Sequence, residues 1–198
     1  MASLLSPIPS TPLDPLWRFT VDQYHLMIDA GILPSGSPVE LVEGVLLQKM
    51  SKKAPHRIST RAARRELEAV VPAGWFVDEQ EPITLADSEP EPDVMVARGD
   101  SSDYPDRHPG AADVALVVEI ADTTIARDRG VKTRMYARAG IAVYWIVDLN
   151  TGRVEVRIDP HGDSYRSLTL LSRSDSISVT IDGMEVGTIP VSRILPKS

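Results

Sequence analysis

Hydrophobic and polar positions follow a helical period near the start of the chain and then change to the alternation of a hairpin. In residues 20–31 the apolar side chains recur at helical spacing, with Thr20 placed to cap the segment and Gly31 to end it. The stretch VELVEGVLLQKM follows, in which aliphatic residues flank Glu43 and Gly44. That pattern predicts two short strands joined by a turn at Glu43-Gly44.

The rest of the chain predicts strands interrupted by two longer helices. One helix should begin at residue 57 or 58 and end at residue 71, because Pro72 cannot continue it. A second helix is expected at residues 124–139. Strands are expected at WFVDEQ to ITL, PDVMVA, ALVVEIA and VYWIVDL, and further hairpins at SYRSLTLL and SISVTI. The fold class is therefore α+β, with a flexible Pro-rich tail at residues 1–17 and a single domain at residues 18–198.

Composition excludes several classes of protein. The 198 residues include no cysteine, so disulfides, thiolate metal sites and cysteine nucleophiles are ruled out. No G-x-S-x-G elbow is present, which disfavours a serine hydrolase. No apolar run approaches the roughly 20 residues of a membrane span, and the start of the chain has no basic segment of the kind found in signal peptides. We therefore expect a cytoplasmic protein that does not enter a membrane.

The charge balance limits how this protein could bind nucleic acid. The net charge is −7, from 21 basic and 28 acidic residues, so any such contact must come from a local basic patch. One patch is predicted on the first of the longer helices, where four arginines share a face: Arg57, Arg61, Arg64 and Arg65. A solvated helix face, balanced by Glu66 and Glu68, is the alternative.

Three charged residues are unusual for a plain hydrophobic core. Asp93 enters the apolar strand PDVMVA, where it could bind an ion or simply terminate the strand. Glu119 interrupts the apolar run ALVVEIA, and a buried carboxylate requires a cation, a metal or a structural ion pair. Lys132 lies on the following helix, where a surface pair with Asp128 is the alternative to a role in a site.

Considered together, these three side chains predict a specific chemistry. Two carboxylates on neighbouring strand ends form the hard oxygen site that Mg²⁺ prefers. A lysine beside them could orient a water molecule or offset the charge that develops on a phosphate. The combination of Asp93, Glu119 and Lys132 is therefore a minimal set for metal-assisted phosphodiester hydrolysis, provided that the fold brings the three together.

Several motifs in this order resemble a known family. EPDVMV, ALVVEIADTTIARDRGVK and YARAGIAVYWIVDL, with VELVEG and the His of KKAPHR upstream, resemble the Uma-two family of bacterial restriction endonucleases. That family belongs to the PD-(D/E)XK nuclease superfamily, and the resemblance covers roughly residues 20 to 160. It implies a restriction-endonuclease-like mixed β-sheet core flanked by helices, with an N-terminal helix and hairpin and a β-rich C-terminus.

The resemblance also implies roles for particular residues. Asp93 and Glu119 match the metal ligands, with the backbone carbonyl of Ile120 as a third ligand, and the ion would be Mg²⁺ or Mn²⁺. In the commonest layout of the superfamily a lysine stands two positions after the glutamate, but that position here is Ala121. In the resembling family the lysine comes from the next helix, and Lys132 matches it.

The hairpin and the segment after it contribute further candidates. Glu40 matches the hairpin glutamate of the family and is expected to be an accessory ligand or a water-positioning group. Glu43 is more simply a turn residue, and strand alternation puts Glu40 and Glu43 on opposite faces, so at most one should serve the site. A solvated hairpin remains the alternative for both. His56 could contact the site or a phosphate, or be structural.

The expected function is that of a metal-dependent endonuclease acting on DNA. One alternative is a catalytically inactive module of the same fold, which binds nucleic acid or protein. Another is a homodimeric scaffold formed through the β-rich C-terminus. These alternatives share the fold, and fold alone does not establish activity.

Overall fold

The computed structural model describes residues 16–34 and 36–197. Its centre is a six-stranded sheet with the strand order β3-β4-β5-β6-β7-β8, in which β5 and β6 are parallel and the other neighbours are antiparallel. The strands are β3 (Trp75–Asp78), β4 (Val94–Arg98), β5 (Val114–Ala121), β6 (Val143–Asp148), β7 (Arg153–His161) and β8 (Ser164–Leu171). This mixed sheet, flanked by helices, confirms the predicted fold class.

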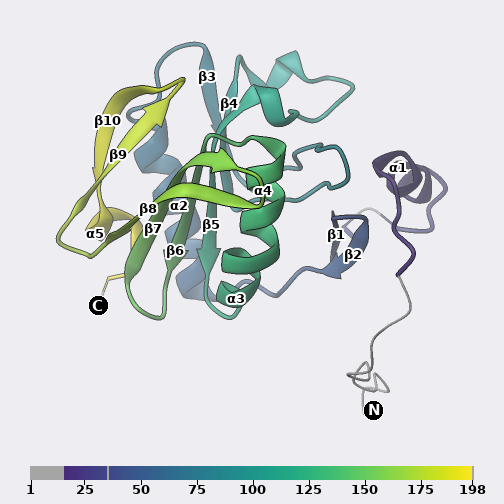
Figure 1. The fold of residues 1–198 in the computed structure, drawn as a ribbon, viewed down its shortest axis with the longest axis horizontal. Helices are drawn as coiled ribbons and strands as arrows, with labels where there is room; N and C mark the ends of the chain where they lie inside the picture. Colours follow the sequence, from purple (N-terminus) through teal and green to yellow (C-terminus); the bar gives the residue numbers. More distant parts are fainter. Residues whose placement is uncertain (1–15, 35, 198) are drawn as a thin grey trace.

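Helices cover both faces of the sheet, with α2 (Ala54–Glu68) behind it and α4 (Thr133–Ala139) in front of it in Figure 1. Ala63 and Leu67 of α2 join one apolar cluster, and Met135 and Tyr136 of α4 join the other. Because both faces are covered, every residue of the two parallel strands β5 and β6 is buried. A charged residue on either strand is therefore held inside the protein.

The remaining elements lie around this core. The N-terminal part contains α1 (Val21–Asp29) and the hairpin of β1 (Val39–Val42) and β2 (Val45–Gln48). The C-terminal part contains β9 (Ser176–Ile181), β10 (Met184–Pro190) and α5 (Val191–Ile194), and its buried side chains join the cluster beneath α2. Short 3₁₀ turns, η1 (Ser101–Asp103) and η2 (Ala111–Asp113), precede β5. Among the described residues, no helix has the length and apolar character needed to cross a membrane.

Three sequence predictions about element boundaries were wrong. The helix expected from residue 57 or 58 to residue 71 is α2, which ends at Glu68. It begins as early as Ala54 because a proline is tolerated in the first turn of a helix. The stretch ITL forms no strand, and only Thr84 makes an isolated bridge, to Gly110. The helix expected at 124–139 is divided into α3 (Ile125–Arg127), a π-helical turn η3 (Asp128–Lys132) and α4.

The predicted division into a tail and one domain stays a prediction. Most of the tail, residues 1–15, falls outside the described residues.

Gly44 in the β1–β2 turn is expected to be sensitive to any added side chain. Its φ is +74°, and a Cβ built there would lie 2.6 Å from the Cβ of Arg18 and 3.0 Å from the carbonyl oxygen of Phe19. Gly44→Ala should therefore lower the free energy of unfolding by about 2–4 kcal/mol, which combines left-handed strain with overpacking. Chemical denaturation of the purified variant measures this loss.

Gly31 provides the matched control for this substitution. Its φ is +71°, close to that of Gly44, but no atom lies within 4 Å of the position that a Cβ would take. Gly31→Ala should carry only the backbone strain, about 1–2 kcal/mol. Equal losses in the two variants would show that the contact with Arg18 and Phe19 relaxes without cost.

Candidate active site

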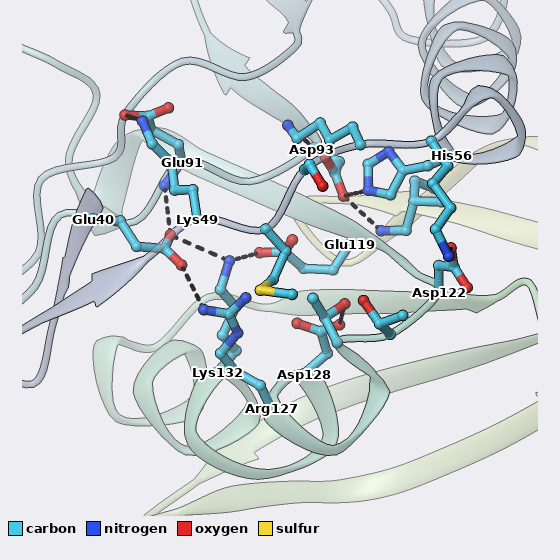
Figure 2. Close-up of a pocket in the computed structure, with 17 residues that line it drawn as sticks. Glu40, Lys49, His56, Glu91, Asp93, Glu119, Asp122, Arg127, Asp128 and Lys132 are labelled. Atoms are coloured by element: carbon cyan, nitrogen blue, oxygen red, sulfur yellow. Dashed lines mark hydrogen bonds and ion pairs between the residues drawn. The ribbon is translucent and has the colours of Figure 1, made fainter. Parts of the chain in front are cut away.

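A pocket with a volume of about 60 Å³ lies where the C-terminal end of β5 meets the first turn of α2 and the turn η3 (Figure 2). Its charged lining comes from segments far apart in the sequence, and it combines acids with cations. The acids are Glu40, Glu91, Asp93, Glu119, Asp122 and Asp128, and the cations are Lys49, Lys52, Lys53, Arg127 and Lys132. All four of the predicted catalytic residues, Glu40, Asp93, Glu119 and Lys132, therefore line one pocket, as does Ile120.

Asp93 stands immediately before β4 and is only 4% exposed. Its Oδ2 accepts a hydrogen bond of 2.9 Å from the backbone N–H of Ile120, so the side chain replaces the backbone partner that β4 no longer provides. Two basic side chains face the same carboxylate, with Nε2 of His56 3.1 Å from Oδ2 and Nζ of Lys52 3.0 Å from Oδ1. Asp93 thus terminates the strand and also carries an ion-paired carboxylate.

The environment of Asp93 keeps it ionised. Burial acts to raise the pKa of this carboxyl group, but the hydrogen bond from His56 and the charge of Lys52 outweigh burial and hold the pKa below its ordinary value.

Glu119 lies in the middle of the pocket, between Lys132 and Asp93 in Figure 2. Its Oε1 accepts hydrogen bonds from Nζ of Lys132 at 2.7 Å and from the hydroxyl of Tyr136 at 2.9 Å. Burial raises the pKa of Glu119 to about 8, against the opposing effect of the Lys132 charge. The residue that interrupts the apolar run in β5 is thus a buried acid, and its charged form is stabilised by a cation.

Lys132, at the end of η3, is 4% exposed, so the surface pair with Asp128 considered from the sequence is wrong. Its ammonium lies 2.7 Å from Oε1 of Glu119 and 3.4 Å from Oε2 of Glu40. Burial acts to lower the pKa of Lys132, but Glu119, Glu40 and Asp128 together outweigh it and raise the pKa above the ordinary value. Lys132 is therefore a fixed ammonium group.

The π-helical turn that carries Lys132 is stabilised by side-chain hydroxyls. The carbonyl oxygen of Asp128 accepts hydrogen bonds from the hydroxyl of Thr133 at 2.8 Å and from that of Tyr144 at 3.2 Å. The Asp128 carboxylate is buried and accepts a hydrogen bond of 2.6 Å from Thr124. Such π turns are often found at functional sites, and this one brings Asp128 and Lys132 into the same pocket.

The two hairpin glutamates have different surroundings, as strand alternation predicted. Glu40 is 3% exposed and lines the pocket, where it faces Lys132 and, at 3.8 Å, Arg127. Glu43 occupies the turn with a φ of +47° and pairs with Arg134 at 2.6 Å, outside the pocket. Of the two, only Glu40 is available to the site.

The sequence pointed to Lys132 beside Glu119 but missed other partners of the two central acids. His56 was expected in a loop, but α2 begins early enough to place it in the first helical turn, facing Asp93. Lys52 was quoted only within the motif KKAPHR, and Tyr136 was not considered. The KKAPHR motif was the one available signal for Lys52 and His56.

The donor atoms of the pocket suit a hard divalent cation. Among the described residues no group of three His, Cys, Asp or Glu side chains stands ready to hold an ion. Mg²⁺, however, is usually bound through one or two carboxylates, and water and phosphate oxygens complete its shell. Asp93 and Glu119 supply two such carboxylates, and the Ile120 backbone lies beside them. The residues present therefore fit such an ion chemically.

The model of the Uma2 family, described as "Putative restriction endonuclease", matches residues 21–191. The chain belongs to this family. The resemblance drawn from its motifs is confirmed, and membership in Uma2 supports a nuclease function.

The Uma2 chain also resembles a solved structure. That structure is described as the crystal structure of "a putative nuclease belonging to DUF820" from Anabaena variabilis ATCC 29413. The similarity has a TM-score of 0.64 at 15% sequence identity and covers 89% of this chain and 97% of that chain. The two proteins share a fold. No curated protein matches the sequence.

Proposed function

We propose that this Uma2 protein is a divalent-metal-dependent endonuclease that hydrolyses phosphodiester bonds in DNA. The observation that best supports the proposal is the shared pocket, in which two buried acids, Asp93 and Glu119, lie beside the buried ammonium of Lys132. Ion pairs that only stabilised the fold would have no need to bring two acids and a lysine from separate elements into one open pocket.

In this proposal Asp93, Glu119 and the carbonyl of Ile120 hold Mg²⁺ or Mn²⁺. The ion would supply Lewis-acid polarisation of the scissile phosphate. Lys132 provides a fixed positive charge that stabilises the negative charge developing on the phosphate or orients the attacking water. Glu40, 3.4 Å from that ammonium, orients it or helps to position the water.

The proposed DNA contact is the exposed face of α2. Arg57 and Arg61 are exposed and form no ion pair with any described residue. Arg64 and Arg65, by contrast, pair with nearby glutamates, so the predicted stripe is partly neutralised. Arg61 and Arg65 also line one hollow with two further cations, Arg193 and Lys197. This arrangement supports phosphate binding by an otherwise acidic protein.

Removal of the two unpaired arginines should weaken DNA binding and reduce its dependence on salt. In the double variant Arg57→Gln/Arg61→Gln, the slope of log K against log salt should fall in magnitude by about 2, or close to 1 per lost phosphate contact. Fluorescence anisotropy with a labelled DNA duplex measures the slope. Arg166→Gln, an exposed change on β8 at the far edge of the sheet, should leave it unaltered.

The direct test of the proposed function is cleavage by the wild-type protein. Supercoiled plasmid DNA incubated with purified protein should be nicked in Mg²⁺ or Mn²⁺ and remain intact in excess chelator. Absence of nicking in both ions, together with absence of Mn²⁺ binding in calorimetric titration, would overturn the proposal.

A second candidate is an inactive module that binds nucleic acid or protein, for example as a homodimer. It is favoured by the ion pairs that already neutralise both central acids, Asp93 with Lys52 and Glu119 with Lys132. Such a module would bind no Mn²⁺ yet still retain DNA or elute as a dimer in sizing chromatography.

A further inference from the structure

A lysine-rich segment crosses one side of the pocket. Residues 49–53, with the sequence KMSKK, connect β2 to α2, and all five line the pocket; we call this segment the lysine strap. Each of its lysines pairs with a different acid: Lys49 with Glu91 at 2.7 Å, Lys52 with Asp93 at 3.0 Å, and Lys53 with Asp122 at 3.4 Å. The strap is therefore held to the pocket by separate ion pairs.

These lysines differ from Lys132 in their exposure to solvent. The side chains of Lys49, Lys52 and Lys53 are 28%, 30% and 65% exposed, whereas that of Lys132 is 5% exposed. The carboxylate of Asp93 is only 5% exposed, so Lys52 can leave it only when another cation takes its place. Because its own side chain reaches water, Lys52 can make this exchange, whereas Lys132 is fixed in the interior.

Lys52 occupies the place where its charge conflicts most with a bound ion. Its ammonium lies 3.0 Å from Oδ1 of Asp93, one of the two acids proposed to hold the metal. A divalent cation on that carboxylate would meet the positive charge of Lys52 within a few ångströms, where like charges in a partly buried site repel strongly. The ion and Lys52 therefore compete for Asp93.

We propose that the lysine strap couples ion binding to DNA binding: an ion on Asp93 releases Lys52, and the free ammonium then binds a backbone phosphate beside the scissile bond. Lys49 and Lys53 hold the strap at the pocket during this exchange. The inference rests on the proposed endonuclease function and adds its regulation. Because coupling between two ligands is reciprocal, DNA that draws Lys52 away also tightens the binding of the ion.

The first test is Mn²⁺ binding without DNA, measured by calorimetric titration of the full-length protein. Lys52→Met removes the competing charge and keeps most of the side-chain volume, so the dissociation constant should fall on the order of tenfold. Arg166→Met is the matched control, because it removes one exposed positive charge on β8 and does not line the pocket, and it should bind Mn²⁺ as the wild type does. If Lys52 only supported Asp93 structurally, its loss would leave Mn²⁺ affinity unchanged or weaker, which would overturn the proposal.

The second test compares the salt dependence of DNA binding with and without Ca²⁺, which serves as the ion probe. Fluorescence anisotropy with a labelled DNA duplex gives the slope of log K against log salt for wild type and Lys52→Met. Without Ca²⁺ the two slopes should agree, because Asp93 holds Lys52. With Ca²⁺ the wild-type slope should exceed the slope of Lys52→Met in magnitude by about 1, because the wild type gains one phosphate contact. Equal slopes in both conditions would overturn the coupling.

Failure of this inference is distinguishable from failure of the proposed function. A wild-type protein that neither binds Mn²⁺ nor nicks DNA overturns both. A wild-type protein that does both, with a Lys52→Met variant that matches it in Mn²⁺ affinity and in salt slope, overturns only the coupling.

Discussion

Glu119→Gln is expected to lower the rate of DNA cleavage by at least about 10²- to 10³-fold, the loss typical when one essential charge-stabilising group is removed. Glutamine keeps the shape of the side chain and an oxygen that can accept from Lys132 and Tyr136. It lacks the negative charge that would hold a divalent ion. Because burial already disfavours the charged form of Glu119, the free energy of unfolding should change little. Plasmid nicking and chemical denaturation measure the two effects.

Glu89→Gln is the matched control for this substitution. Glu89 is likewise buried, at 4% exposed against 5% for Glu119, and it is hydrogen-bonded to His25 at 2.7 Å and to Thr84 at 2.8 Å, but it does not line the pocket. Its replacement should leave the cleavage rate unchanged. If Glu119→Gln cleaved DNA at the wild-type rate, Glu119 would not be a ligand of the catalytic ion.

The central strands were predictable because their apolar composition indicates that they are buried. ALVVEIA and VYWIVDL are apolar at all but one position each, as expected for parallel strands covered on both faces, and β5 and β6 are such strands. In that setting Glu119 is conspicuous, since few physical explanations exist for an acid inside an apolar strand. Asp93 was less certain, because its strand-terminating role and its ion pairs give the same sequence signal.

The surroundings of these acids were not predictable, because they depend on backbone details that the pattern does not encode. The apolar spacing of α2 gave no indication that the helix extends back to Ala54 and so brings His56 to Asp93. Hydrophobic periodicity likewise does not distinguish a continuous helix from one with a π turn at Asp128–Lys132. The pairing of Lys52 with Asp93 joins residues forty-one positions apart and required the fold itself.

The packing around Ala121 explains why the lysine comes from a helix. Ala121 is fully buried and belongs to the apolar cluster that contains Met135 and Tyr136. A lysine in that position, two residues after Glu119, would have to fit within this apolar cluster, and overpacking a core typically costs about 1–3 kcal/mol. Lys132 instead reaches Glu119 from the helical side, where η3 borders the pocket.

Lys132→Met is accordingly expected to reduce kcat by about 10²- to 10³-fold without weakening the binding of the metal ion. The substitution removes the fixed ammonium and retains most of its volume. Mn²⁺ affinity should be unchanged or greater, because a positive charge 2.7 Å from a proposed ligand is lost. Glu119 would be left without its cation, but its raised pKa allows it to take up a proton instead, so the free energy of unfolding should fall by only about 1–3 kcal/mol.

The role of Lys132 follows from whether Lys132→Met changes kcat alone or changes both kcat and Mn²⁺ affinity. A residue that acts on the phosphate should lose turnover and keep the ion, whereas a residue that merely holds the pocket together should lose both. Lys132→Arg refines the test, because it restores the charge but must fit a larger, planar group beside Tyr136, whose hydroxyl shares the same Glu119 oxygen. Partial recovery of kcat in Lys132→Arg would identify the charge itself as the contribution of Lys132. Loss of Mn²⁺ binding and cleavage together in Lys132→Met would instead assign it to the architecture of the pocket.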